Sequence, residues 1–167
     1  WSDEDFVRAM QEGIGPEGQH YFPSFPYPAF SKMSEEDLLH LKDYLFSLPP
    51  IQRNNQPHEL QFPFNLRLNA WFWNILFHDP EPITPDPSRS ASWNRGRYLT
   101  EAVAHCAECH TPRNQLGVLR SDLAYAGAKE GPEGKLTPNI TPDKETGIGG
   151  WNKDDLVSVS YKHLRAH

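Results

Sequence analysis

The distribution of proline limits what this chain can fold into. Its 167 residues include sixteen prolines, and eight of these fall between residues 49 and 92. A proline lacks a backbone donor and interrupts the interior of a helix or of a central strand, which excludes a regular helical bundle. The prolines are clustered rather than spread evenly, unlike those of a disordered tract. The sequence therefore predicts short helices separated by long irregular loops.

Helix start signals stand between the proline clusters. Ser2 and Ser34 each precede an aspartate by three residues, a spacing typical of a helix N-cap and its partner. The helix after Ser34 carries a leucine stripe and should end at Pro49. Further helices are expected over residues 93–105 and from Asn152 onward, with a short aromatic helix or turn, interpreted as a packing strut, over residues 66–78.

Residues 21–30, with the sequence YFPSFPYPAF, alternate prolines with aromatic side chains. Three prolines in ten residues are incompatible with a helix interior or a central strand. This segment is therefore predicted to be an extended loop that buries large apolar side chains.

A short internal repeat links the two ends of the chain. Residues 1–7, WSDEDFV, resemble residues 151–157, WNKDDLV, in the tryptophan, the second acidic residue and the valine. Both segments begin a predicted helix with the same capping pattern. The repeat predicts that the chain holds the rear of one structural unit, a connector and the front of a second unit.

Charge and hydropathy exclude several classes of partner. Sixteen basic and 22 acidic residues give a net charge of −6, which argues against nucleic acid, since phosphate binding needs a basic surface. No apolar run approaches the length of a membrane-spanning helix. The first ten residues, WSDEDFVRAM, have neither a basic nor an apolar signal region, so this segment is not expected to contain a signal peptide.

The motif with the clearest chemistry is the CAECH sequence of residues 106–110. The pattern C-x-x-C-H is the attachment signature of c-type haem. Two thiols three residues apart can form thioethers with the two vinyl groups of one porphyrin, and Cys106 and Cys109 are assigned this role. The next residue, His110, then lies under the iron as the proximal ligand. The carbonyl of Pro112 is predicted to accept the Nδ1 proton of the imidazole and so to orient the ring.

Other readings of the cysteine pair fit less well. A structural zinc site needs four ligands, and the chain has only two cysteines. A redox C-x-x-C motif belongs in a βαβ context, whereas the surroundings here are helical and rich in proline. Two accidental buried thiols would leave the adjacent histidine unexplained.

The sixth iron ligand is less well defined. A methionine thioether favours Fe(II) and raises the reduction potential, and the chain has two methionines. Met10 lies on the apolar face of the first predicted helix, where a packing role is expected. Met33 follows the stiff proline loop, which could hold a thioether against iron, although a packing role fits its spacing equally well.

Five segments together resemble the cytochrome c domains of multi-haem subunits that serve periplasmic alcohol, gluconate and related dehydrogenases. They are WSDEDFVRAM, YPAFSKMSEEDLLHLKDYLFSLPP, FPFNLRLNAWFWNILF, WNRGRYLTEAVAHCAECHTPRN and LTPNITPDKETGIGGW, and they span nearly the whole chain. The resemblance implies an all-α, cytochrome c-like fold with long proline- and glycine-rich loops. It also implies that the segment comprising Leu136, Thr137, Pro138 and Asn139 lies along the haem edge.

The resemblance further implies that Met33 is the distal ligand of the haem of a preceding domain. Many relatives have methionine at the position of Phe25, and this chain departs from that pattern. The resemblance implies that residues 1–50 are the rear half of one cytochrome domain, residues 51–92 a connector, and residues 93–167 the front half of the next domain. The chain is then part of a di- or tri-haem cytochrome, although a permuted single domain is an alternative.

The function implied is electron transfer through covalent haem c, from a dehydrogenase subunit to a downstream quinone, cytochrome or oxidase. Thioether formation implies export to the periplasm, and any association with a membrane would come through parts outside this chain. The alternative is a haem enzyme of peroxidase or sulfur-oxidising type with an open sixth position. Its acid–base groups would come from His163, Arg165 or His167.

Overall fold

The computed structural model describes residues 1–56, 59–60, 62, 65–129, 131 and 134–165, with only the backbone for residues 163–165. In these residues helices dominate, and pairing between extended segments is limited to isolated bridges. The all-α prediction is confirmed. No helix in the described part of the chain combines the length and apolar character needed to cross a membrane.

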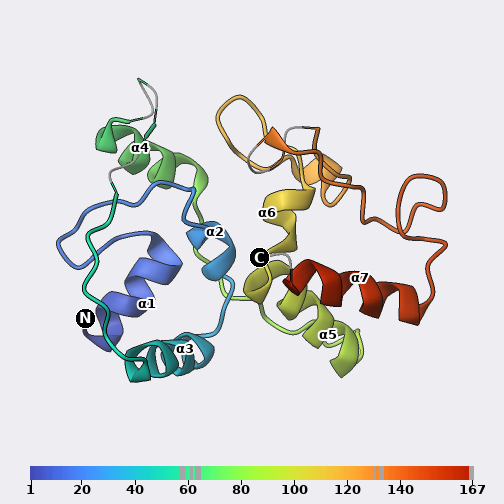
Figure 1. Ribbon diagram of the computed structural model, residues 1–167, viewed down its shortest axis with the longest axis horizontal. Helices are drawn as coiled ribbons and strands as arrows, with labels where there is room; N and C mark the ends of the chain where they lie inside the picture. The colour runs from blue at the N-terminus through green and yellow to red at the C-terminus, as the bar shows by residue number, and fades with distance from the viewer. Residues whose placement is uncertain (57–58, 61, 63–64, 130, 132–133, 166–167) are drawn as a thin grey trace. The chain divides into compact units, whose positions relative to one another are not determined.

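The chain forms two compact units, which are described separately. Unit 1 comprises Trp1–His105 and unit 2 comprises Cys106–His167. The helices of unit 1 are α1 (Asp3–Glu12), α2 (Tyr27–Phe30), α3 (Glu35–Ser47), α4 (Arg67–Phe77), α5 (Ala91–Tyr98) and the π-helical turn η1 (Leu99–Val103) (Figure 1). Those of unit 2 are α6 (Cys106–His110), the 3₁₀ turn η2 (Ser121–Leu123) and α7 (Lys153–Arg165).

Two of the predicted helix starts have the expected capping contacts. The Ser2 hydroxyl accepts a hydrogen bond from the Asp5 amide at 3.0 Å, and the Asp5 carboxylate accepts one from the Ser2 amide at 3.2 Å. The Ser34 hydroxyl likewise accepts from the Asp37 amide at 3.2 Å. These contacts satisfy backbone donors that a helix leaves unpaired at its first turn. Helices α1 and α3 therefore begin where the sequence predicts.

The proline–aromatic segment differs from its prediction. Instead of being extended throughout, it contains the one-turn helix α2, with Pro26 at the N-cap and Pro28 in the first turn. The first turn of a helix tolerates proline because its amides have no helical acceptor. The expectation of buried apolar side chains is confirmed at Tyr27, which has no exposed surface.

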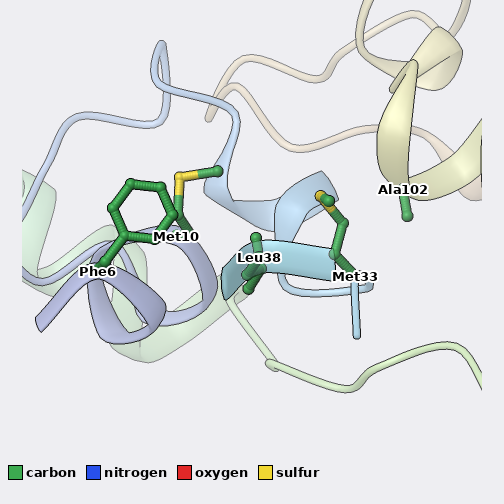
Figure 2. Close-up of a cluster of buried hydrophobic side chains, with 5 residues drawn as sticks. All are labelled: Phe6, Met10, Met33, Leu38 and Ala102. Carbon is green, nitrogen blue, oxygen red and sulfur yellow. The ribbon is translucent and has the colours of Figure 1, made fainter. Parts of the chain in front are cut away.

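The core of unit 1 gathers around Leu38, which is fully buried. Figure 2 shows the cluster: Phe6 and Met10 come from α1, Leu38 from α3, Met33 from the segment before α3, and Ala102 from η1. Segments from both ends of unit 1 therefore contribute to a single core.

Helix α4 packs against the first two helices through polar and aromatic contacts. Asn74 Nδ2 donates to the carbonyl of Glu12 at 2.6 Å, and His78 Nε2 donates to the carbonyl of Gln11 at the same distance. The Tyr27 ring meets the His78 ring edge-on at 4.8 Å. The segment is thus a packing strut, as predicted, through Asn74 of α4 and His78 at its C-terminal end.

The single helix predicted over residues 93–105 is interrupted. Helix α5 ends at Tyr98, the π-helical turn η1 follows, and His105 then adopts a positive φ of 40° before Cys106. Such a φ is uncommon for a residue with a Cβ atom. The α5–η1 segment packs on α2 and α3, where Tyr98 Oη donates to Asp37 and accepts from the Ser34 amide.

In the described residues, unit 2 consists of α6, η2, α7 and the long loops that join them. At the start of α7 the Asn152 side chain accepts from the Asp155 amide at 3.1 Å, and the Asp155 carboxylate accepts from the Asn152 amide at 3.0 Å. This reciprocal pair reproduces the Ser2–Asp5 pair of α1. The predicted repeat therefore extends from the sequence to the capping hydrogen bonds.

Unit 1 should lose stability as the pH falls through the titration range of His78. Burial lowers the pKa of His78 in the folded state below its ordinary value. The unfolded chain therefore binds the proton first as the pH falls below about 6.5, and the free energy of unfolding decreases. The slope from this residue can reach about 1.4 kcal/mol per pH unit.

Chemical denaturation at a series of pH values between 5 and 8 would measure this effect. His78→Gln, which keeps a donor for the Gln11 carbonyl, should flatten the slope. His40→Gln makes the same substitution at an exposed position of α3 and should change the stability at pH 8 by no more than about 0.5 kcal/mol. Equal slopes in the wild type and the His78 variant would contradict the prediction.

Candidate functional site

Helix α6 positions both thiols and the histidine of the CAECH motif. Cys106 and Cys109 are free cysteines and half-buried. Burial raises the pKa of both thiols, and the Glu108 carboxylate adds to the effect at Cys109. Both effects favour the protonated form of these thiols.

The imidazole of His110 is oriented by a backbone carbonyl from a distant loop. Its Nδ1 lies 2.8 Å from the carbonyl oxygen of Pro138. Because a carbonyl can only accept, Nδ1 carries the proton in this hydrogen bond. An imidazole held in this way coordinates a metal through Nε2, and the hydrogen bond increases the basicity of the ligand.

The predicted role of Pro112 is wrong. Its carbonyl accepts from the Arg120 amide at 2.9 Å, and the residue that orients His110 is Pro138. The chain turns away from α6 after Thr111 into the short antiparallel contact between Arg113 and Leu119. In this turn the Pro112 carbonyl is hydrogen-bonded to the Arg120 amide, so its partner comes from the same loop.

Thr137 connects the same loop to the end of α6. Its hydroxyl donates to the carbonyl of Cys109 at 2.7 Å and accepts from the Ala128 amide at 3.0 Å. The carbonyl of His110 accepts from the Gly127 amide at 2.8 Å. The last carbonyls of α6 are therefore satisfied by side-chain and loop donors, as helix ends require.

The remaining loop residues differ in their surroundings. Leu136 is 75% exposed. The Asn139 side chain closes a turn by accepting from Thr141 and donating to Thr146 at 2.9 Å. The structure thus brings Thr137 and Pro138 to the CAECH helix, whereas Leu136 faces solvent and Asn139 braces the following turn.

Thr111, Gly127 and Ala128 support the site without having been predicted. Thr111 is 3% exposed, and its hydroxyl accepts from the Tyr125 amide at 3.0 Å. Gly127 has a φ of +83° and lies directly against the backbone of residues 137–139. The only signal in the sequence was the run of small residues AGA at 126–128, which by itself does not indicate a contact.

A methyl group at Gly127 should displace the loop that orients His110. A Cβ at this position would lie 2.7 Å from the Thr137 carbonyl oxygen and 2.8 Å from the Asn139 amide. Together with the unfavourable positive φ, Gly127→Ala should destabilise unit 2 by about 2–4 kcal/mol. Thermal denaturation followed by circular dichroism measures the loss.

Gly134→Ala is the matched control, because this glycine has a φ of +70° with open space around it. It should lower the free energy of unfolding only by the cost of a positive φ for a residue with a Cβ atom, about 1 kcal/mol. If both variants lose the same stability, the close approach of Gly127 to residues 137–139 has no energetic importance.

Met33, the predicted distal ligand, lies in unit 1 with 6% of its surface exposed. It packs in the core with Leu38 and Ala102, and its carbonyl accepts from Gln11 Nε2 at 3.0 Å. Unit 1 also contains an apolar cavity of about 480 Å³. Met10, rather than Met33, is the methionine that lines this cavity.

The described residues do not form the ligand set of a structural zinc site. Among the residues that the structure describes, no group of three or more His, Cys, Asp or Glu side chains could hold a metal ion by itself. A zinc site would need such a group. Two free cysteines beside an oriented histidine instead fit a porphyrin that would be held by two thioethers and an imidazole.

The acid–base groups of the enzyme alternative are only partly located. His163 and Arg165 lie in α7, of which only the backbone is described there, and His167 is outside the described residues.

Several curated proteins are similar to this chain over most of its length, although no protein-family model matches it. It is 43% identical over 158 residues to a diheme cytochrome c-type protein of Cereibacter sphaeroides, covering 94% of this chain and 51% of that protein. It is 36% identical over 166 residues to the fructose dehydrogenase cytochrome subunit of Gluconobacter japonicus, covering 98% and 34%. It is 30% identical over 164 residues to the gluconate 2-dehydrogenase cytochrome c subunit of Pantoea cypripedii, covering 93% and 37%.

The chain spans about half the length of the first of these relatives and about a third of the other two. The matches include the CAECH helix as well as unit 1, because they extend over more than nine-tenths of the sequence. The homologues of this chain are therefore diheme cytochromes c and the cytochrome c subunits of fructose, gluconate and alcohol dehydrogenases, the group that its sequence resembles.

Proposed function

We propose that this chain is the electron-transferring part of a periplasmic c-type cytochrome that accepts electrons from a dehydrogenase. The observation that carries the proposal is the hydrogen bond from His110 Nδ1 to the Pro138 carbonyl, at the end of the helix that bears both thiols. The character of the homologues, which are cytochrome subunits of dehydrogenases, supports it.

Haem c is the cofactor that this site fits. Cys106 and Cys109 would hold it through thioethers, formed when each S–H adds across a vinyl group with no net change of oxidation state. His110 would supply the axial nitrogen, with Thr137 and Pro138 fixing the helix end and the ring. When bound, the haem would supply one-electron chemistry through its Fe(III)/Fe(II) couple, accepting one electron and passing it on.

The protein's contribution is to hold this arrangement rigid. Thr137 and Gly127 donate hydrogen bonds to the carbonyls of Cys109 and His110, which ties the end of α6 to the loop that orients the imidazole. A site with fixed ligands undergoes little rearrangement when its charge changes. That property suits repeated electron transfer better than substrate turnover.

The segment assignment is part of the proposal. Residues 1–50 would be the rear half of one cytochrome domain, residues 51–92 the connector and residues 93–167 the front half of the next. The matching capping pairs at Ser2 and Asn152 support this repeat. The contact of α5 with α3 would then join neighbouring half-domains.

Met33 is proposed as the distal ligand for the haem of the first of these domains. Its backbone amide donates to the Phe30 carbonyl and its carbonyl accepts from Gln11, so the backbone that carries the thioether is held in place. The onward electron acceptor would be a quinone, another cytochrome or an oxidase. Association with a membrane would involve other parts of the natural protein.

A redox titration of the chain, matured with covalent haem, would test the proposed function. A carrier should show a reversible one-electron transition with a slope of about 59 mV per tenfold change in ratio. The reduced carrier should be oxidised once per haem by peroxide and then stop, and the oxidised carrier should be reduced once per haem by a reduced sulfur compound and then stop. Sustained turnover of either compound would favour the haem-enzyme alternative and contradict the proposal.

A further inference from the structure

Helix α4 is apolar on two opposite faces. The inner face packs on unit 1 through Ala70, which is 2% exposed, and through Trp73 and Asn74. The second face consists of five residues at positions i, i+3, i+4, i+7 and i+8, a spacing that forms one helix stripe. This outer stripe comprises Leu68, Trp71, Phe72, Ile75 and Leu76, which are between 40% and 66% exposed.

A packing strut requires only the inner face, so the outer stripe needs another explanation. Arg67 at the first position is the only charged residue of α4. Two aromatic and three aliphatic side chains without an intervening charge match the composition at the centre of a protein interface. Contiguous exposed apolar surface of this kind usually marks an interaction site.

A lipid surface fits the outer stripe less well than a protein does. Helices that lie in a membrane interface carry Lys or Arg along a polar face. Helix α4 has no polar face, because the side opposite the stripe contacts Tyr27 and Glu12 of the same unit. The net charge of −6 also provides no general attraction to anionic lipids.

The size of the outer stripe indicates a transient partner rather than a permanent second copy. A large side chain has about 150–250 Å² of surface when fully exposed. Five such side chains, each about half exposed, therefore present roughly 500 Å² of accessible surface to a partner. A complex formed on this surface would bury roughly 1,000 Å² in total, within the range of short-lived electron-transfer complexes. Permanent homodimers commonly bury 2,000 Å² or more.

We propose that the outer stripe of α4 docks into an apolar groove on the dehydrogenase that donates electrons, with Trp71 and Phe72 as the anchoring side chains. This inference rests on the proposed function, because it assigns a surface to the donor complex. It is separable from that function, since loss of docking leaves the haem site intact.

The experiment measures reduction of the haem-loaded chain by two dehydrogenases freed of their own cytochrome subunits. These are the fructose dehydrogenase of Gluconobacter japonicus and the gluconate 2-dehydrogenase of Pantoea cypripedii, whose cytochrome subunits are similar to this chain. Ile75→Glu should raise the KM for the chain by about tenfold with kcat unchanged. Its circular dichroism spectrum should match that of the wild type.

Val157→Glu on α7 is the matched control, because Val157 and Ile75 are each 58% exposed. It should leave KM unchanged. If Ile75→Glu also leaves KM unchanged, or if Val157→Glu raises it equally, the docking proposal is overturned and the proposed function stands. If dithionite reduces the chain but neither dehydrogenase does, both the donor and the docking proposal are contradicted.

A second arm addresses the lipid alternative. The wild-type chain should not sediment with vesicles of phosphatidylcholine and phosphatidylglycerol. Sedimentation that Ile75→Glu abolishes would show that the outer stripe binds lipid, and would overturn the proposal of a protein partner.

Discussion

Replacing both Cys106 and Cys109 with alanine is expected to remove all acid-resistant haem from the protein. Thioethers survive acidified acetone, whereas haem held only by an axial histidine is extracted. The wild-type chain, produced with a cytochrome c maturation system, should therefore stay coloured in the protein pellet. The double variant should release any pigment into the solvent.

The single variants Cys106→Ala and Cys109→Ala serve as controls for folding. Each retains one thiol on α6 and should keep a fraction of the pigment through one thioether. If the pigment of the wild-type chain is extracted freely, covalent attachment at this helix is ruled out.

His110→Ala is the second change with a large expected effect. Loss of the axial nitrogen should alter the ligand-field spectrum of the haem and either lower its potential or bleach the protein. Absorption spectroscopy and a redox titration measure these changes. Added imidazole should restore part of the spectrum, because it replaces the missing ring.

His105→Ala is the control for His110. His105 directly precedes α6 and His110 is its last residue, but the His105 ring packs edge-on against Phe30 in unit 1, with ring centroids 5.5 Å apart. Its replacement should leave both the spectrum and the potential unchanged. Equal effects at the two positions would mean that the axial ligand has been assigned to the wrong histidine.

Helix starts were predictable from the sequence because the signals that specify them are local. Ser2, Ser34 and Asn152 each cap a helix by bonding to an amide within three residues. The same is true of the two thiols and the histidine of α6, which five consecutive residues bring together. In both cases the geometry follows from neighbouring residues alone.

The contacts that orient the site were not predictable in the same way. Pro112 is two residues from His110, but the carbonyl that the imidazole contacts belongs to Pro138, 28 residues away. This partner depends on the path of the loop through Gly127, which allows the backbone of residues 137–139 to approach closely. A resemblance to related sequences placed the loop near the haem edge, but it did not supply this contact.

Two predictions of secondary structure, a loop over residues 21–30 and a helix over residues 93–105, were wrong because of backbone geometry. The prolines of residues 21–30 predict an extended loop, yet Pro28 fits the first turn of α2. The helix expected over residues 93–105 ends in a π-helical turn and a positive φ at His105. Near this break Ala102 packs into the core of unit 1 against a cluster that includes Phe6 and Leu38. Because these residues are far away in the sequence, the residues next to the break do not predict it.

The mass of the intact protein tests the central claim most directly. The chain should be produced with a cytochrome c maturation system, denatured, and analysed by mass spectrometry without reduction. The account predicts a single species heavier than the polypeptide by one haem, with the added mass on the peptide that contains Cys106 and Cys109. A chain of unmodified mass, or haem located on any other peptide, would contradict it.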